Sequence, residues 1–189
     1  MQDLTRPHPK GQNSIEQLNR DTFRAGIEAL ARPGRPQRIQ PLFDSHLLAM
    51  ASSLLYSKIL YCYQGRRTDF HLVEAMTGAT SAPPEASHYL FADSPSIGLW
   101  RQASTGSMEK PETSATCIFD CSGTDETGVI LRGPGIKDAL RTHLPVAEAF
   151  ASAILEDRPP FPQGVDLFLL DGPGRLIGLP RTTAIEVLR

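Results

Sequence analysis

The chain reads Val-Asp-Leu-Phe-Leu-Leu from Val165 to Leu170, turns through Gly172-Pro173-Gly174, and continues Arg-Leu-Ile-Gly-Leu from Arg175 to Leu179. The first run is almost wholly apolar, which is typical of a strand buried on both faces of a sheet. The turn after it predicts an antiparallel hairpin with the second run. This hairpin decides the fold, because a doubly buried strand needs covering layers on both sides.

Helices and strands interleave along the chain before this hairpin. Apolar spacing predicts a helix from Asp21 with Phe23, Ile27 and Leu30 on one face, ended by Pro33-Gly34. Asp44 or Ser45 is expected to cap a second helix with a broad apolar stripe. The other expected elements are a short helix from Thr68 to Met76, a loop or short helix over Ile97–Gln102, and strands at Ile59–Tyr63, His88–Ala92 and Ala184–Leu188.

The stretch from residue 113 to residue 155 carries two further expectations. Thr113–Cys121 and Gly128–Leu131 have strand composition, and the glycine between them predicts that they form a hairpin. A helical segment is expected from Lys137, and a second helix start at Pro145 runs to Leu155. Together the elements predict an α/β domain over residues 14–189, with a mixed sheet sandwiched by helices, after a polar tail at residues 1–13.

The composition excludes several classes of protein. The 189 residues include 40% hydrophobic and 21% charged side chains, which is enough to form a core and rules out a solvated disordered chain. A net charge of −2 gives no basic surface for nucleic acid. The apolar stretch Leu47–Tyr56 is too short to span a membrane, the start lacks the apolar run of a secretory signal, and three cysteines suit a reducing cytoplasm.

A first candidate anion site is the run from Arg132 through Gly133 and Pro134 to Gly135, where a strand is expected to lead through two glycines into a helix. Backbone N–H groups at such a junction can point at an anion. The run lacks the Gly-Lys-Ser/Thr ending of a phosphate-binding P-loop, so an ordinary strand-to-helix turn is the alternative.

A second candidate is Arg181 with Thr182 and Thr183, at the end of a strand. A guanidinium presents a planar pair of donors to a phosphate or carboxylate, and two hydroxyls beside it could complete an oxyanion site. In the alternative interpretation Arg181 pairs with a nearby carboxylate such as Glu186. Asp166, at the start of the buried strand, needs donors of its own, and Arg181 or backbone N–H groups could supply them.

The sequence identifies no catalytic residue and no metal site. Cys117 and Cys121 fall on one face of a strand and are expected to form a buried thiol pair, since no metal-ligand spacing accompanies them. The histidines lie in no nucleophile motif. A pyridoxal phosphate (PLP) Schiff base would need a buried lysine among Lys10, Lys58, Lys110 and Lys137, and none of their positions suggests one. We therefore expect no cofactor.

The C-terminal block from Arg158 to Leu169 and from Arg175 to Thr183 closely resembles that of the PhnH family, a subunit of bacterial carbon–phosphorus lyase. Within it lie Pro162, Gly164 and Asp166. Shorter pieces resemble the family in the same order and contain Arg24, Gly34, Gly106, Glu112, Gly133 and Gly135. The segment 57–85 departs from the family pattern, which has an acidic turn after the second helix.

This resemblance implies a role in phosphonate metabolism, in an assembly with the PhnG, PhnI and PhnJ proteins. In the first stage of that pathway a phosphonate displaces adenine from ATP at the ribose carbon. The resemblance also implies a fold similar to the large domain of PLP-dependent transferases, without the cofactor, and a homodimer when isolated. A structural or co-catalytic subunit is therefore expected, and the alternatives are an independent anion- or nucleotide-binding module and a PLP-type transferase.

Overall fold

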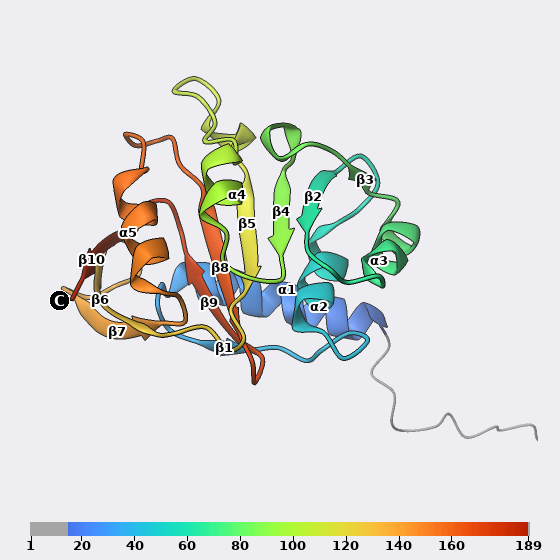
Figure 1. The fold of residues 1–189 in the computed structure, drawn as a ribbon, viewed down its shortest axis with the longest axis horizontal. Helices are drawn as coiled ribbons and strands as arrows, with labels where there is room; N and C mark the ends of the chain where they lie inside the picture. The colour runs from blue at the N-terminus through green and yellow to red at the C-terminus, as the bar shows by residue number, and fades with distance from the viewer. Residues whose placement is uncertain (1–14, 189) are drawn as a thin grey trace, which may run out of the picture.

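The structure is a computed structural model that describes residues 15–188, so the expected tail at residues 1–13 lies outside the described residues. A seven-stranded mixed sheet forms the centre, in the order β1-β9-β8-β5-β4-β2-β3 (Figure 1). Its strands are β1 (Gln37–Arg38), β2 (Leu60–Gln64), β3 (Thr80–Ser81), β4 (Tyr89–Ala92), β5 (Thr116–Asp120), β8 (Asp166–Asp171) and β9 (Arg175–Leu179).

The predicted hairpin at the C-terminal end is confirmed. β8 pairs antiparallel with β9 on one side, with Leu169 opposite Ile177, and parallel with β5 on the other. Residues Leu167–Leu170 are buried, as expected for a strand covered on both faces. The remaining inner strands β5, β4 and β2 run parallel, so helical crossovers connect them.

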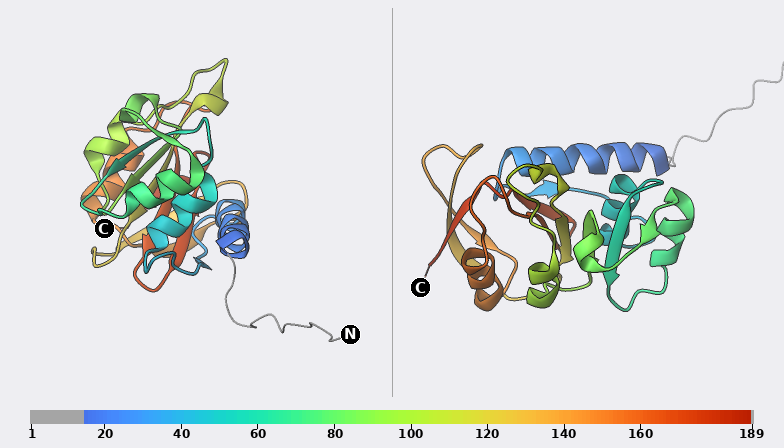
Figure 2. Two further views of the ribbon diagram at one scale, coloured as in Figure 1. Left: turned by 90° about the vertical axis from the view of Figure 1, so that its right-hand side faces the viewer. Right: turned by 90° about the horizontal axis from the view of Figure 1, so that it is seen from above.

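Helices cover both faces of the sheet (Figure 2). One face carries α1 (Ile15–Ala31), α2 (His46–Leu54) and α3 (Phe70–Thr77), which pack on Phe91, Ile118 and Phe168. The other face carries α4 (Ile97–Gln102) and α5 (Glu148–Glu156). These two helices pack on the alternate side chains of the same strands, such as Phe119 and Leu169, which point to this face. The mixed sheet sandwiched by helices is thus confirmed.

The predicted cap of the second helix is also confirmed. Ser45 is the N-cap of α2, and its Oγ accepts a hydrogen bond from the Leu48 backbone N–H at 3.2 Å. α3 begins two residues later than expected and ends at Gly78 in the left-handed conformation. Two short 3₁₀ turns, η1 (Pro84–Ala86) and η2 (Pro111–Thr113), complete the helical elements that the structure describes.

The first helix begins earlier than expected, and two of the three residues of its predicted apolar face point outward, whereas Leu30 packs partly buried against the core. Phe23 and Ile27 are 50% and 54% exposed, whereas Thr22, Gly26 and Ala29 are buried. The reason is close backbone packing. A Cβ at Gly178 in β9 would lie 2.6 Å from the Ala29 carbonyl carbon, so only small residues fit where α1 crosses the sheet. The larger apolar side chains lie beside the contact.

Two expectations for the middle of the chain are wrong. β5 forms no hairpin with β6 (Thr127–Arg132), because β5 is a central strand between β4 and β8. The segment after Lys137 is not a helix but β7 (Leu140–Leu144), whose side chains alternate between more and less buried. β6 and β7 form a separate antiparallel sheet with β10 (Ala184–Val187), in the order β10-β6-β7, beside α5.

Candidate functional site

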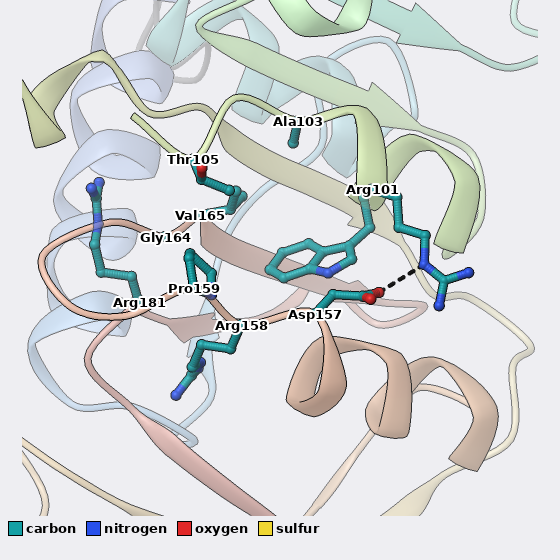
Figure 3. A pocket seen from close by; sticks show the side chains of 10 residues that line it. Arg101, Ala103, Thr105, Asp157, Arg158, Pro159, Gly164, Val165 and Arg181 are labelled. Carbon is teal, nitrogen blue, oxygen red and sulfur yellow. Dashed lines mark hydrogen bonds and ion pairs between the residues drawn. The ribbon is translucent and has the colours of Figure 1, made fainter. Parts of the chain in front are cut away.

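A cavity of about 260 Å³ opens at the amino end of β8, between the last turns of α4 and α5 (Figure 3). Three arginines, Arg101, Arg158 and Arg181, contribute to its lining, together with Trp100 and the carboxylate of Asp157. The side chains come from three regions of the chain, which the sheet brings together. The lining therefore carries more positive than negative charge.

The ends of the two helices place the first pair of charges. Arg101 lies in the last turn of α4, and its Nε donates to Asp157 Oδ2 at 2.8 Å. Asp157 is the C-cap of α5, which ends here because Pro159 and Pro160 follow and cannot continue a helix. The Arg101–Asp157 pair lies on one side of the cavity, and the next residue, Arg158, also contributes to its lining.

Arg158 is the cation without a carboxylate partner. Its Nη1 donates to the Thr183 backbone carbonyl, and no ion pair within residues 15–188 includes it. Burial lowers the pKa of its guanidinium from the ordinary value. A desolvated guanidinium held by a neutral carbonyl retains donors for an anion that enters the cavity.

Arg181, by contrast, is engaged in the framework of the protein. Its backbone N and its Nη2 donate to Asp166 at 2.8 Å each, and its Nη1 donates to the Pro111 carbonyl at 2.8 Å. The expectation that Asp166 finds its donors in Arg181 is confirmed. The alternative partner, Glu186, pairs instead with Arg132 at 2.7 Å.

The proline-rich lead-in to β8 and the turn after α4 form one unit with Arg181. The Gly164 N–H donates to the Thr105 carbonyl at 2.9 Å, and the Gln163 amide donates to the Gly106 carbonyl at 3.0 Å. Gly164 has a φ of 143°, and a Cβ there would lie 2.8 Å from the Cβ of Arg181. Glycine is therefore required for this close approach. Pro162 lies in the same lead-in, after a cis peptide bond.

The glycine loop after Arg132 has a structural explanation. The expected helix after Gly135 is absent, because the loop leads into β7, so no helix N-terminus is available there for an anion. A Cβ at Gly133 would lie 2.8 Å from the Thr182 carbonyl oxygen, and one at Gly135 would lie 2.2 Å from a carbonyl of α1. The two candidate motifs thus pack against each other.

The hydroxyls of the second candidate lie apart from the cavity lining. Thr182 is exposed, whereas Thr183 is fully buried and its Oγ1 has no hydrogen-bond partner among the described residues. Thr183 contributes to the site through its carbonyl, which holds Arg158. The other family-motif residues lie elsewhere: Arg24 is exposed on α1, Gly34 follows α1 with a φ of 75°, and Glu112 is exposed in η2.

Sequence reasoning did not select Trp100, Arg101 or Arg158 as site residues. The position of Arg158 between a helix end and two prolines was the one available signal, since a rigid segment fixes the residue before it. The cavity itself depends on how α4 and α5 lie beside each other, and no local pattern encodes that.

Lys10 lies outside the described residues, and the cysteines and lysines within residues 15–188 do not supply a nucleophile. Cys117 and Cys121 are buried as expected, and burial raises the pKa of both thiols, which keeps them protonated. Lys58, Lys110 and Lys137 are exposed rather than desolvated in an apolar pocket. No group of three His, Cys, Asp or Glu side chains within residues 15–188 could hold a metal ion.

Fold and cavity together define a mixed α/β protein with a small cavity lined by three arginines. The chain belongs to the PhnH family of bacterial phosphonate metabolism proteins, whose sequence model matches residues 11–186. No curated protein gives a match. Among the described residues, no helix has the length and apolar character needed to cross a membrane.

Proposed function

We propose that this chain is a subunit of the carbon–phosphorus lyase assembly, together with PhnG, PhnI and PhnJ. Its role is structural or co-catalytic, in the cytoplasm, at the step that couples an organophosphonate to ATP with loss of adenine. Support comes from the family membership over nearly the whole chain and from a site that offers cations to a ligand.

The observation that carries the proposal is Arg158 in the cavity. Phosphonates and the triphosphate of ATP are anions that a guanidinium binds through two parallel hydrogen bonds. Arg101 and Arg181 add positive charge, although each already has a carboxylate partner. Arg158 is the one of the three that can give its charge to a ligand without breaking an ion pair.

A second surface supports the role as a subunit. Phe23 and Ile27 of α1 are half exposed and border an apolar groove that continues to Leu54 and Tyr89. A contiguous apolar surface of this kind is typical of a protein–protein contact. We propose that another chain covers it, a second copy in the isolated protein or a neighbouring subunit in the assembly.

Deletion and complementation in a phosphonate-using bacterium test the role in the assembly. Deletion should abolish growth on a phosphonate as the phosphorus source, and a tagged copy should restore growth and co-purify the other subunits. Growth that survives deletion, together with a tagged chain that purifies alone, would refute the proposal.

Substitution of Arg158 tests the cavity separately. Arg158→Gln should weaken ATP or methylphosphonate binding about tenfold or more, as expected for one charge-assisted contact. Arg35→Gln is a suitable control, because Arg35 is exposed and lies outside the cavity. Equal affinities of the two variants in calorimetry would show that the cavity does not bind the anion.

A further inference from the structure

A second crevice, of about 490 Å³, lies at the carboxyl ends of the parallel strands, whereas the cavity described above lies at an amino end. It is formed where β2 and β4 end, by the residues that follow each strand, Gln64–Arg66 and Ala92–Ser96. β2 and β4 are parallel neighbours. The crevice therefore lies at the carboxyl edge, where open α/β sheets bind their ligands.

The connections from these two strands diverge. β2 leads through α3 to β3 on its outer side, whereas β4 leads through α4 to β5 on its inner side. α3 packs in the core on one face of the sheet and α4 in the core on the other. Such a divergence leaves the space between two adjacent strand ends uncovered, which makes it a topological switch point.

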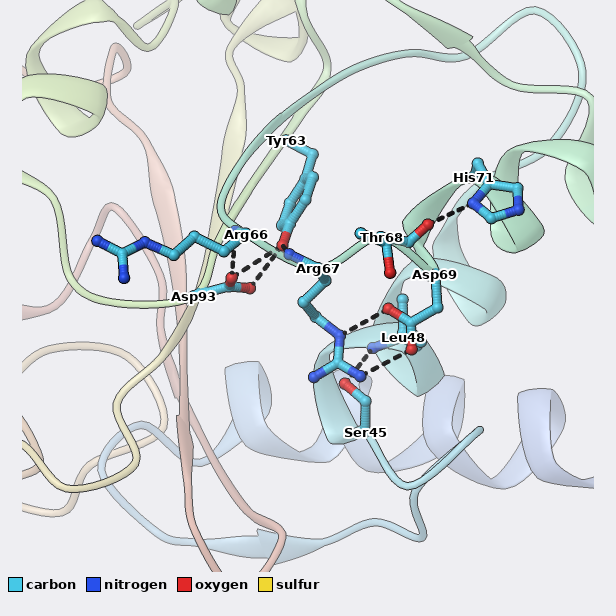
Figure 4. Close-up of polar contacts among 9 residues, drawn as sticks. All are labelled: Ser45, Leu48, Tyr63, Arg66, Arg67, Thr68, Asp69, His71 and Asp93. Carbon is cyan, nitrogen blue, oxygen red and sulfur yellow. Dashed lines mark hydrogen bonds and ion pairs between the residues drawn. The ribbon is translucent and has the colours of Figure 1, made fainter.

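A hydrogen-bond network shapes this crevice (Figure 4). The Tyr63 hydroxyl donates to Asp93 at 2.8 Å and accepts from the Arg67 backbone N–H at 2.8 Å, and the Arg66 backbone N–H donates to Asp93 Oδ2 at 2.8 Å. A Cβ at Gly65 would lie 2.4 Å from Asp93 Oδ2, so a larger residue there would displace this carboxylate. The loop after β2 is thus built around one carboxylate.

The two arginines of this loop differ. Arg67 is held by Asp69, with Nε and Nη2 donating at 3.0 and 2.8 Å. The Arg66 guanidinium is exposed and has no hydrogen-bond or ion-pair partner within residues 15–188, while its backbone is fixed by Asp93. Figure 4 shows the two side chains pointing away from each other. Arg66 thus presents an unpaired positive charge beside the crevice.

We propose that this crevice binds a phosphorylated sugar. The phosphate pairs with Arg66, and neighbouring sugar hydroxyls donate to Asp93, whose two oxygens retain acceptor capacity beyond the bonds from Tyr63 and Arg66. Asp93 repels a bare anion, so a ligand that combines a phosphate with hydroxyl donors fits better than phosphate alone. The proposal rests on the contacts of Asp93 and on the unpaired Arg66 guanidinium, and not on the family role.

Calorimetry of the full chain with ribose 5-phosphate, inorganic phosphate and ribose tests the proposal. Ribose 5-phosphate should bind at least about tenfold more tightly than either fragment, and Arg66→Ala should weaken it about tenfold or more. Arg38→Ala is the matched control, since Arg38 is also exposed but lies in β1 at the far edge of the sheet, and it should bind as the parent does.

Three results would overturn the proposal. They are no saturable binding of ribose 5-phosphate to the parent, equal affinity for inorganic phosphate, and unchanged binding in Arg66→Ala. Loss of binding in Arg158→Gln with retention in Arg66→Ala would also overturn it, because it would assign the ligand to the other cavity. A role in phosphonate growth would survive each of these results, so the two proposals can fail separately.

Discussion

Replacement of Arg181 by alanine should destabilise the protein rather than act on binding alone. The change removes three side-chain hydrogen bonds, two to Asp166 and one to the Pro111 carbonyl. The side chains of Arg181 and Asp166 are only 19% and 20% exposed, so the carboxylate left behind is poorly hydrated. Removing one partner of a buried pair costs about 3–5 kcal/mol.

The partial exposure of this pair places our expectation near the lower end, at about 3 kcal/mol of unfolding free energy. For a chain of this size that corresponds to a fall in Tm of roughly 6–12 °C. Urea denaturation followed by circular dichroism measures the free energy, and a thermal scan measures the Tm.

The exposed pair Arg132–Glu186 provides the control. Its side chains are 51% and 57% exposed, so Arg132→Ala should cost less than about 1 kcal/mol. A double-mutant cycle of Arg181→Ala with Asp166→Ala should give a coupling energy of about 1–3 kcal/mol. A loss in Arg181→Ala no larger than in Arg132→Ala, or a coupling near zero, would refute the framework role of Arg181.

Three further predictions concern the helix cap, the thiols and the exposed apolar surface. Ser45→Ala should lower the unfolding free energy by about 1 kcal/mol in urea denaturation, because the Leu48 N–H loses its acceptor; no change would show that the cap contributes nothing. A thiol reagent should modify Cys62 slowly at pH 7 and faster as the pH rises above 9, because burial raises the pKa of its thiol above the ordinary value. Cys117 and Cys121 should react only on unfolding, and modification of all three at one rate in the native protein would contradict this. Phe23→Glu should reduce self-association in light scattering while leaving the circular dichroism spectrum unchanged, and an unaltered mass would place the contact elsewhere.

The parts of the fold that local patterns encode could be predicted from the sequence. The run from Val165 to Leu170 and the turn after it determine a buried hairpin because burial and turn chemistry are both local. The cap of the second helix could be narrowed to Asp44 or Ser45 for the same reason, and the structure shows that it is Ser45. The pairing of Asp166 with Arg181 followed from a simple requirement, that a carboxylate at the start of a buried strand needs donors.

The errors arose where partners distant in sequence decide the outcome. β7 alternates over only five residues, Leu140–Leu144, and it is a strand because β6 lies beside it. The orientation of α1 depends on Gly178, about 150 residues further along, whose missing side chain lets the helix backbone approach the sheet. Arg158 and Trp100 meet only when α4 and α5 lie side by side, so the cavity had no local signature.

The contact between α1 and β9 has a consequence for biosynthesis. A ribosome makes the helix at residues 15–31 long before the strand beneath it, Arg175–Leu179. The Gly34 N–H donates to the Gly178 carbonyl at 3.3 Å, so two segments far apart in sequence close the same layer. Vectorial synthesis therefore leaves the helix without its partner strand until residue 179 has emerged, and a nascent chain stalled before residue 175 should remain sensitive to protease.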